Sequence, residues 1–457
     1  MAPPLGEDQS TVADQWGERM PRTVGLWSAV VVLVGVTVGS GIFRVPATVD
    51  GLLHSPGPAM FCWTLGGLVA LAGALSVAEL AAAMPRSGGI FAYLLEAYGP
   101  LPAFLFGWTE LAVIRASALG ATSTIFAEYL GYFIPLTPRQ VHWVAAATIL
   151  TVGTINYIGV KRAVAVLTPA TAAKFAALLI LGLLAFTAVS GGTGEPVHRV
   201  IWQGGAQLSL IATALVPVMW TYDGWADVSF MGGEVAQPQR TLPLALIIGT
   251  CCVMLVYLVV NLGFLYALPA SAIAHAPLVA TTVAQHIPLI GSAGAAVIAA
   301  VVLLSTFSGL HASLMTGSRV IFAMGDRGLL FRSVGRVSPR FKSPSVAIWI
   351  ATLLGCVYVM QNDFAQLADR FVLGLWPFYV LTVAAVYVLR YRQPDLERPY
   401  RTWGYPIVPA VFLLASFGML ANALVTDPRD TGVTLLIIVA GIPIYYLWRR
   451  FTIPRVA

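Results

Sequence analysis

The chain has 457 residues, of which 58% are hydrophobic and only 10% are charged, with a net charge of +6. A soluble protein carries about 25% charged residues, so this chain has too few to cover a water-exposed surface. The composition therefore excludes a soluble enzyme, a nucleic-acid-binding protein and a disordered protein, and it indicates a membrane protein.

Twelve apolar runs follow one another along the chain, and a helix of about 20 apolar residues is enough to cross a bilayer. In chain order, the runs cover residues 25–49, 58–84, 101–130, 140–158, 164–188, 207–232, 243–267, 291–322, 345–360, 371–390, 406–426 and 432–448. Between them, the moderately hydrophobic segment 269–288 predicts a surface loop with a short helix. The first 20 residues lack an apolar segment, so we expect no cleaved signal peptide.

The distribution of Lys and Arg predicts that both termini are cytoplasmic, because cytoplasmic loops carry an excess of these residues. With this orientation, 18 of the 26 cationic residues lie on the cytoplasmic side. Four would lie outside (Arg139, Arg199, Arg370, Arg429) and four within the spans (Arg44, Arg115, Lys174, Arg319). The protein is therefore expected in the cell (inner) membrane. The four cysteines lie in apolar runs without CxxC spacing, so neither a disulfide nor a zinc site is expected.

Two of the apolar runs contain residues that break a helix. The first run contains Gly39, Ser40 and Gly41, and the sixth contains Asp223 next to Gly224. Interrupted helices at corresponding positions of two halves are the best sequence indication of the central site of a transporter. The alternative is that the first motif is only a small-residue packing face.

A helix break exposes backbone groups that can bind ions. The free N–H groups of Ser40, Gly41 and Ile42 would bind a carboxylate, helped by the positive end of the following half-helix. Free carbonyl groups at the ends of the half-helices would bind an ammonium group. One anion site beside one cation site matches an α-amino acid.

At these residues the sequence resembles the amino acid–polyamine–organocation superfamily, and more closely its L-type amino acid transporter branch. The matching segments are VGSGIF (38–43), PRSGG (85–89), WTELAVIR (108–115), TYDGWADVSFMGGEVAQPQRTLP (221–243) and RPYRTWGYPIVP (398–409). Together they extend the resemblance over residues 25 to 450.

The resemblance implies an all-α membrane protein of 12 transmembrane helices with a LeuT-like inverted five-plus-five repeat and two additional C-terminal helices. The implied units are a cytoplasmic tail (1–24), a first repeat (25–190), a second repeat (207–392), a peripheral helix pair (406–448) and a cytoplasmic tail (449–457). A bundle of spans 1, 2, 6 and 7 would rock against a scaffold of spans 3, 4, 8 and 9.

The resemblance also assigns roles to individual residues. The substrate-binding residues are Thr37, Gly39, Ser40, Gly41, Ile42, Trp220, Asp223 and Gly224, with Trp220 and Tyr222 in gating. Lys174 matches a lysine that occupies the place of Na⁺ in sodium-coupled relatives, which implies sodium independence. This lysine is either a fixed cation or a proton carrier.

Several residues leave alternatives open. Asp223 could pair with a cationic substrate or hydrogen-bond the N–H groups of the helix break. Arg44 could extend towards the membrane surface or repel cationic substrates. Because Glu110 and Arg115 are five residues apart, about 140° around an α-helix, they are expected to pair with neighbouring spans rather than with each other. His311 is expected to be a core residue rather than a proton relay.

The first hypothesis for the function is a sodium-independent transporter of small neutral L-amino acids, acting as an exchanger or a proton-coupled symporter. The alternatives are a carrier of cationic amino acids or polyamines that uses Asp223, and a membrane-embedded sensor without net transport. An enzyme would need clustered catalytic or metal-binding residues at membrane depth, which the sequence lacks. The expected partners are an amino acid and the lipid bilayer, without cofactor, metal or nucleic acid. No disulfide-linked heavy chain is expected, because the segment FIPLTPRQ between spans 3 and 4 has no cysteine.

Overall fold

The structure is a computed structural model, and several short segments lie outside the residues that it describes. The described residues are 22–158, 160–187, 205–276, 278–331, 333–338, 340–341 and 343–452. Most of the predicted N-terminal tail, residues 453–457 of the C-terminal tail and the connection 188–204 therefore lie outside the described residues. So do Arg19, Arg199, Arg332, Lys342 and Arg455, which the charge count included.

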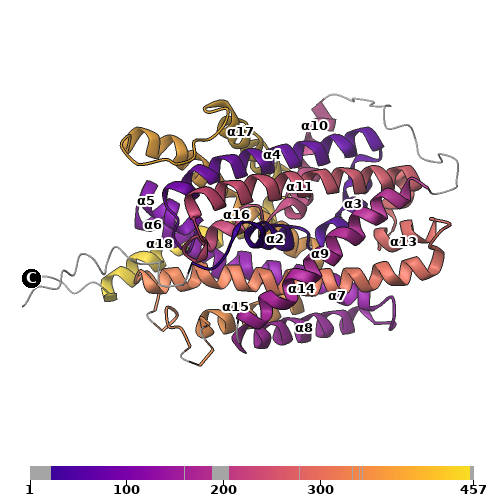
Figure 1. Cartoon of the computed structure of the whole chain (residues 1–457), viewed down its shortest axis with the longest axis horizontal. Coiled ribbons are helices and arrows are strands. Elements are labelled where there is room, and N and C mark those ends of the chain that lie inside the picture. The colour runs from indigo at the N-terminus through magenta and orange to yellow at the C-terminus, as the bar shows by residue number, and fades with distance from the viewer. Residues whose placement is uncertain are drawn as a thin grey trace, which may run out of the picture.

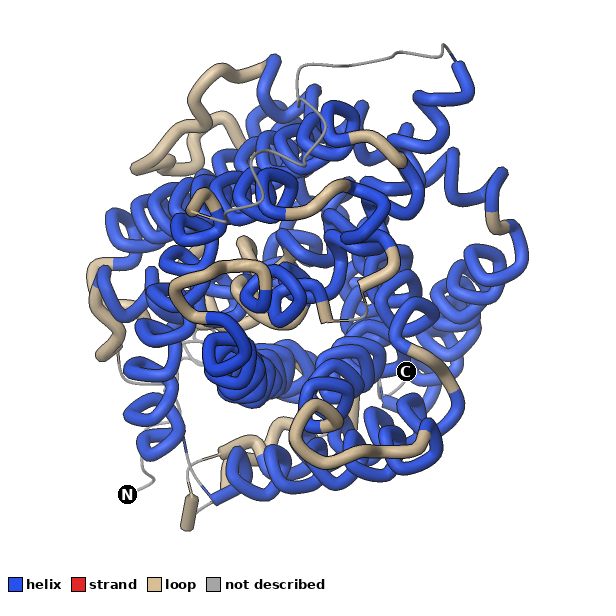
Figure 2. The backbone as a smooth tube through the Cα atoms, turned by 90° about the vertical axis from the view of Figure 1, so that its right-hand side faces the viewer, coloured by secondary structure: helices blue, strands red, loops and turns tan. Residues whose placement is uncertain are grey.

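Over these described ranges the chain is helical, with two isolated β-bridges and no strand (Figures 1 and 2). The first half contains α2 (Leu26–Thr37), α3 (Gly41–Leu53), α4 (Pro56–Ala83), α5 (Ile90–Tyr98), α6 (Pro100–Thr109), the π-helix η1 (Glu110–Ile114), α7 (Arg115–Leu130), α8 (Pro138–Ile158) and α9 (Val160–Ala185). The second half contains α10 (Gly205–Tyr222), the 3₁₀ turns η2 (Asp227–Phe230) and η3 (Gly232–Glu234), α11 (Pro238–Ala267), α12 (Ala270–Ala274), α13 (Val279–Gln285), α14 (Gly291–Asp326), α15 (Ser345–Gln361) and α16 (Phe364–Arg392). The last two helices are α17 (Ile407–Thr426) and α18 (Pro428–Thr452).

The twelve predicted spans all coincide with helices. Among the described residues, eight helices are long and apolar enough to cross a membrane, and α2 with α3 forms a ninth candidate that is bent by 43°. The three remaining spans coincide with shorter apolar helices (Ala172–Ala185, Leu208–Tyr222, Ser345–Gln361). The prediction of an all-α, multi-pass membrane protein is therefore confirmed.

Helix starts follow local sequence rules. Pro56, Pro138 and Pro238 each stand in the first turn of their helix, where the missing N–H group costs no hydrogen bond. Helix α16 begins with a capping box in which Asp363 accepts a 2.9 Å hydrogen bond from the backbone N–H of Gln366. These residues fix where the spans begin relative to the central breaks.

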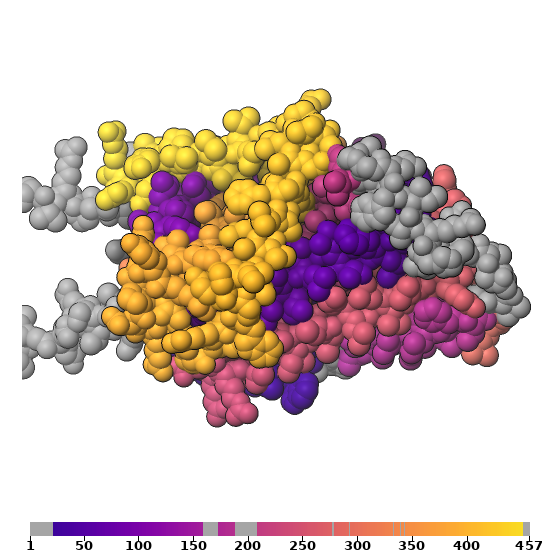
Figure 3. All heavy atoms as spheres, turned by 90° about the horizontal axis from the view of Figure 1, so that it is seen from above, coloured from indigo at the N-terminus to yellow at the C-terminus, as the bar shows by residue number. Residues whose placement is uncertain are grey.

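The helices pack in the two groups that the resemblance implies. In the first group α2 and α4 contact α11, and α3 and α4 contact α10. In the second group α7 contacts α8, α14 and α15. Figure 1 shows α4 beside α11 on one side of the molecule, with α7, α8 and α14 on the other. Helices α17 and α18, in orange to yellow in Figure 3, lie at the periphery.

One expectation about the connections was wrong in part. The segment 269–288 contains short helices, as expected, but it is not a surface loop, because Ile273 in α12 and Val283 in α13 are fully buried. Both short helices pack on α3, and α13 also packs on α14. The segment after the second span, which no predicted span included, forms α5 with buried Phe91 and Tyr93. The position of such a short apolar helix is determined by the helices it packs against, because it is too short to show a clear periodic pattern of its own.

Candidate functional site

The first predicted break lies between α2 and α3. Helix α2 ends at Thr37 and α3 begins at Gly41, so residues 38–40 are not helical. Glycine is required at position 41, because a Cβ atom there would lie 2.8 Å from the Cα atom of Thr221 in α10. The small residue therefore lets the start of α3 lie directly against α10.

The second break follows Tyr222, where α10 ends. Gly224 has φ +106°, a conformation that other residues rarely adopt. A Cβ atom on Gly224 would lie 2.9 Å from the backbone nitrogen of Thr37. The two breaks, which lie far apart in the sequence, are therefore in direct contact, as expected of a central site.

The carbonyl groups at the end of α2 bind two side chains from other helices. The ammonium group of Lys174 in α9 donates a 2.7 Å hydrogen bond to the carbonyl of Gly35. The hydroxyl of Tyr257 in α11 lies 2.8 Å from the carbonyl of Thr37 and 3.2 Å from that of Thr221. Because a helix end carries partial negative charge on its free carbonyls, the fully buried Lys174 has a favourable partner there.

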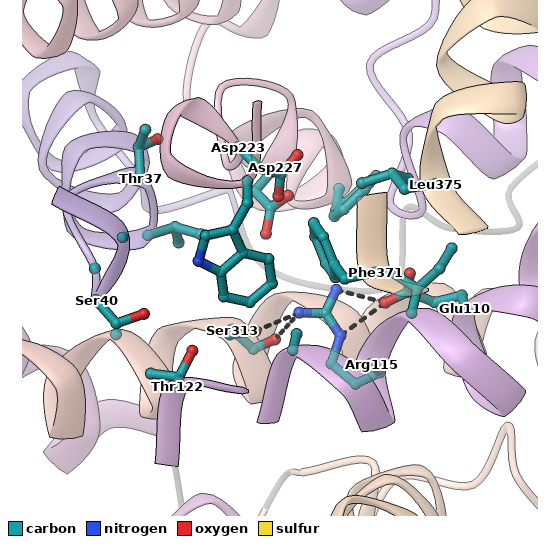
Figure 4. A pocket seen from close by; sticks show the side chains of 18 residues that line it. Thr37, Ser40, Glu110, Arg115, Thr122, Asp223, Asp227, Ser313, Phe371 and Leu375 are labelled. Carbon is teal, nitrogen blue, oxygen red and sulfur yellow. Dashed lines mark hydrogen bonds and ion pairs between the residues drawn. The ribbon is translucent and has the colours of Figure 1, made fainter. Parts of the chain in front are cut away.

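A cavity of about 60 Å³ lies beside the two breaks (Figure 4). It is lined by Val36, Thr37, Gly39, Ser40, Gly41, Glu110, Ile114, Arg115, Ala118, Thr122, Trp220, Asp223, Asp227, Phe230, Gly309, Ser313, Phe371 and Leu375. A water molecule needs roughly 10–15 Å³ of such a cavity. The cavity therefore has room for only a few groups the size of a water molecule. The first N–H groups of a helix have no acceptor within it, which applies to Gly41 and Ile42 at the start of α3, whereas the N–H of Phe43 donates a 3.2 Å hydrogen bond to the carbonyl of Ser40.

An arginine–carboxylate pair forms one wall of the cavity. The Nε atom of Arg115 donates a 2.7 Å hydrogen bond to Glu110, and its Nη2 atom forms an ion pair with the same carboxylate. The Nη1 atom donates to the carbonyl of Ser313 in α14 at 2.8 Å and to its hydroxyl at 2.5 Å. Arg115 also lies directly against Gly317, where any side chain would overlap the guanidinium group.

The expectation that Glu110 and Arg115 do not pair with each other was wrong. Residues Glu110–Ile114 form a π-helix, in which hydrogen bonds join residues five apart instead of four. The wider turn places residues 110 and 115 on the same face. Such turns are found frequently at functional sites.

Two aspartates from the second break also line the cavity. Asp223 accepts a 2.8 Å hydrogen bond from the hydroxyl of Tyr379 in α16 and interacts with the N–H of Gly224. The second contact matches the expectation that this carboxylate satisfies the break itself. Asp227 accepts a 2.8 Å hydrogen bond from Thr316 in α14. The wall of the cavity therefore carries three carboxylates and one guanidinium group.

The predicted site residues are only partly brought together. Six of them line the cavity (Thr37, Gly39, Ser40, Gly41, Trp220, Asp223). Ile42 and Gly224 do not line it, although both belong to the breaks. Tyr222 is buried against Trp63 and Tyr257, with ring centroids 6.1 Å and 5.1 Å away, and does not line the cavity.

Trp220 is covered by aromatic residues of α16. Its ring packs edge-to-face on Phe371 at 4.8 Å and on Phe364 at 6.3 Å between centroids. His311 does not line the cavity. Its Nδ1 atom lies 2.8 Å from the side-chain nitrogen of Asn156 in α8. This position agrees with the expected core residue.

Sequence reasoning missed several residues of the cavity wall. They are Glu110, Arg115, Thr122, Asp227, Ser313 and Phe371. Asp227 follows Asp223 by four residues in the same unwound segment, which was a usable signal. Glu110 and Arg115 were expected only to have a structural role, each paired with a neighbouring span, and nothing local marks Ser313 or Phe371.

A polar cavity between two broken helices of a multi-pass membrane protein defines the class of secondary transporters. The family model described as "Amino acid permease" matches residues 24–447, and the chain belongs to this family. The human b(0,+)-type amino acid transporter 1 is 30% identical over 97% of this chain and 92% of its own length. The serine/threonine exchanger SteT of Bacillus subtilis is 29% identical over 93% and 97%, respectively. The human cystine/glutamate transporter is 29% identical over 94% and 86%.

These relatives confirm the resemblance to the L-type branch of the superfamily. The chain is therefore an amino acid transporter of the membrane rather than an enzyme.

Proposed function

We propose that the protein transports small neutral L-amino acids across the cell membrane without sodium, by alternating access. The observation that supports this best is the size and position of the cavity, which is about 60 Å³ and adjoins both helix breaks. The carboxylate of the substrate would bind the free N–H groups at Ser40, Gly41 and Ile42. Its ammonium group would lie near the carbonyl groups of Thr37 and Trp220. The aromatic residue Trp220 would then cover the bound substrate.

Lys174 supports sodium independence. Its ammonium group is fully buried and binds the carbonyl of Gly35 at the end of the first half-helix. In its protonated form this side chain would place a cation where the resemblance implies that relatives hold Na⁺. The protein would act as an exchanger or as a proton-coupled symporter, and Lys174 would be either a fixed cation or the proton carrier.

The proposed orientation places both termini in the cytoplasm, following the charge asymmetry of the loops. The proposed repeats are residues 25–190 and 207–392, with 406–448 as the peripheral pair. The protein would work without a disulfide-linked heavy chain, because the connection between α7 and α8 (131–137) contains no cysteine.

Purified protein in liposomes tests the proposal. Vesicles loaded with unlabelled serine, threonine or alanine should take up the same labelled amino acids faster than empty vesicles, with or without sodium. A pH gradient imposed on empty vesicles separates proton symport from obligatory exchange. A strict requirement for sodium would contradict the proposal. If no amino acid or polyamine in a broad panel is exchanged or driven by protons, the sensor alternative is favoured.

A second candidate is a carrier of cationic substrates, because carboxylates outnumber guanidinium groups on the cavity wall. The variant Asp223→Asn separates the two candidates. Asparagine keeps an oxygen that accepts the hydrogen bond from Tyr379 but removes the negative charge. If small neutral amino acids are the substrates, their uptake should fall only modestly and the ratio of cationic to neutral uptake should not change. A selective loss of arginine or polyamine uptake in competition assays would favour the second candidate.

A further inference from the structure

Arg44 pairs with a carboxylate of another helix, a contact that neither of the two alternatives from the sequence included. It lies in the first turn of α3, and its Nε atom is 3.6 Å from Oε2 of Glu128 in α7. The two side chains are 28% and 27% exposed, so the pair is neither in the core nor freely solvated. Neither residue lines the central cavity.

The pair belongs to a set of contacts that joins four helices, α3, α7, α10 and α16. The guanidinium group of Arg44 lies 6.0 Å from the ring centroid of Phe364, the first residue of α16. Phe364 in turn packs on Trp220, which lines the cavity. Next to the pair, the hydroxyl of Tyr129 in α7 donates a 3.1 Å hydrogen bond to the carbonyl of Phe43 in α3.

These contacts connect parts that would move relative to each other under the proposed function, on which this inference rests. Helices α3 and α10 belong to the group that would rock, whereas α7 belongs to the scaffold. Contacts between the two groups on one side of the cavity form when that side closes and are lost when it opens.

We propose that Arg44 and Glu128 form a charge-pair gate that closes the outer path to the cavity together with the contact between Trp220 and Phe364. In the proposed orientation, α3 leads from the cavity to the outer surface, so the pair lies on the outer side. The acidic side chain of Asp363 at the start of α16 lies near enough to Glu128 to add negative charge beside it. Opening outward separates Arg44 from Glu128, and closing restores the pair.

A partly exposed ion pair is weakened by salt, whereas an aromatic contact is not. Outer opening should therefore increase with ionic strength in the unmodified protein. This salt dependence should be absent when either charge is removed, because only the aromatic contact then remains.

Cysteine accessibility tests the gate. In a background that lacks the four native cysteines, Thr122→Cys places a thiol on the cavity wall. A membrane-impermeant thiol reagent is added to the outside of intact cells and the rate of modification is measured. Arg44→Gln and Glu128→Gln should each raise this rate, by at most about fivefold, which is the upper end of the effect of losing a partly exposed ion pair. The matched control is Arg139→Gln, which removes an exposed arginine at the start of α8.

The charge-reversed double variant Arg44→Glu with Glu128→Arg tests whether the gate depends on the attraction between opposite charges or only on the packing of the two side chains. It should return the rate towards that of the unmodified gate. The proposal is overturned if the single variants react no faster than the control, or if the double variant stays as reactive as the single ones. Faster modification from the cytoplasmic face of inside-out vesicles would also overturn it. Because no substrate is needed, these results stand even if the liposome experiment identifies no transported amino acid.

Discussion

Replacing Arg115 with glutamine should abolish most transport and lower the free energy of unfolding by about 3–5 kcal/mol, the usual effect of breaking a buried ion pair. Arg115 is 4% exposed and Glu110 is 1% exposed, so the variant would leave a carboxylate buried without its partner at membrane depth. The two hydrogen bonds that tie α7 to Ser313 of α14 would be lost as well. Thermal unfolding of the purified protein and exchange in liposomes measure the two effects.

Two further variants test whether the effect comes from breaking the ion pair of Glu110 and Arg115 or from removing an arginine in general. Arg401→Gln, which removes an exposed arginine, should leave both measurements unchanged. The double variant Glu110→Gln with Arg115→Met should recover part of the stability, because Glu110 is then no longer a buried carboxylate without its partner, whereas Asp223 and Asp227 still lose the nearby guanidinium group. Its transport should remain low, since Arg115 lines the cavity. A single variant Arg115→Gln that is as stable as the unmodified protein would contradict this account.

The same pair shows where sequence reasoning reaches its limit. On an α-helix, side chains five residues apart point in different directions. The prediction that Glu110 and Arg115 do not pair with each other assumed this geometry. In the structure this segment is a π-helix, and Arg115 at its end meets Ser313 and Gly317 of α14, which are about 200 residues away in the sequence. No local pattern in the segment 108–115 encodes that neighbour.

The two breaks were predictable for a different reason. Inside an apolar run, Gly39 and Gly41 lower helix stability and Asp223 requires polar partners, so the defect is visible in the run itself. The positions of α12 and α13 were not visible, because their short apolar faces are ordered by packing on α3 and, for α13, also on α14. A helix-breaking residue inside a long apolar run can therefore be recognised in the sequence. A short helix that is ordered only by packing on other helices cannot.

The residues of the candidate site also fall into a group that local sequence defects indicate and a group that only tertiary packing brings in. The backbone groups near Thr37, Ser40 and Gly41 follow from the breaks, and all three residues line the cavity. The opposite wall comes from α7, α14 and α16, whose residues Ser313 and Phe371 reach the cavity only through tertiary packing. The sequence therefore predicted the cavity residues that belong to the helix breaks better than those of the opposite wall.

Gly41→Ala should reduce exchange by roughly tenfold, because the added methyl group overpacks the contact between α3 and α10, which typically costs about 1–3 kcal/mol. The new Cβ atom would lie 2.6 Å from Oγ1 and 2.8 Å from Cα of Thr221, and the second of these is backbone that no side-chain rotation can move. Helix α3 must then shift, and with it the N–H groups proposed to hold the substrate carboxylate. Substrate concentration dependence in liposomes measures the loss.

The matched control is Gly418→Ala in α17, where a Cβ atom meets nothing within 4 Å and transport should not change. Adding Thr221→Ala to Gly41→Ala should restore exchange only in part, because it removes the nearest side-chain oxygen but leaves the overlap with the backbone of residue 221. If Gly41→Ala exchanges amino acids as fast as the control, the close approach of α3 to α10 is not needed for binding. The carboxylate would then have to be held elsewhere, with Arg115 as the remaining cation on the cavity wall.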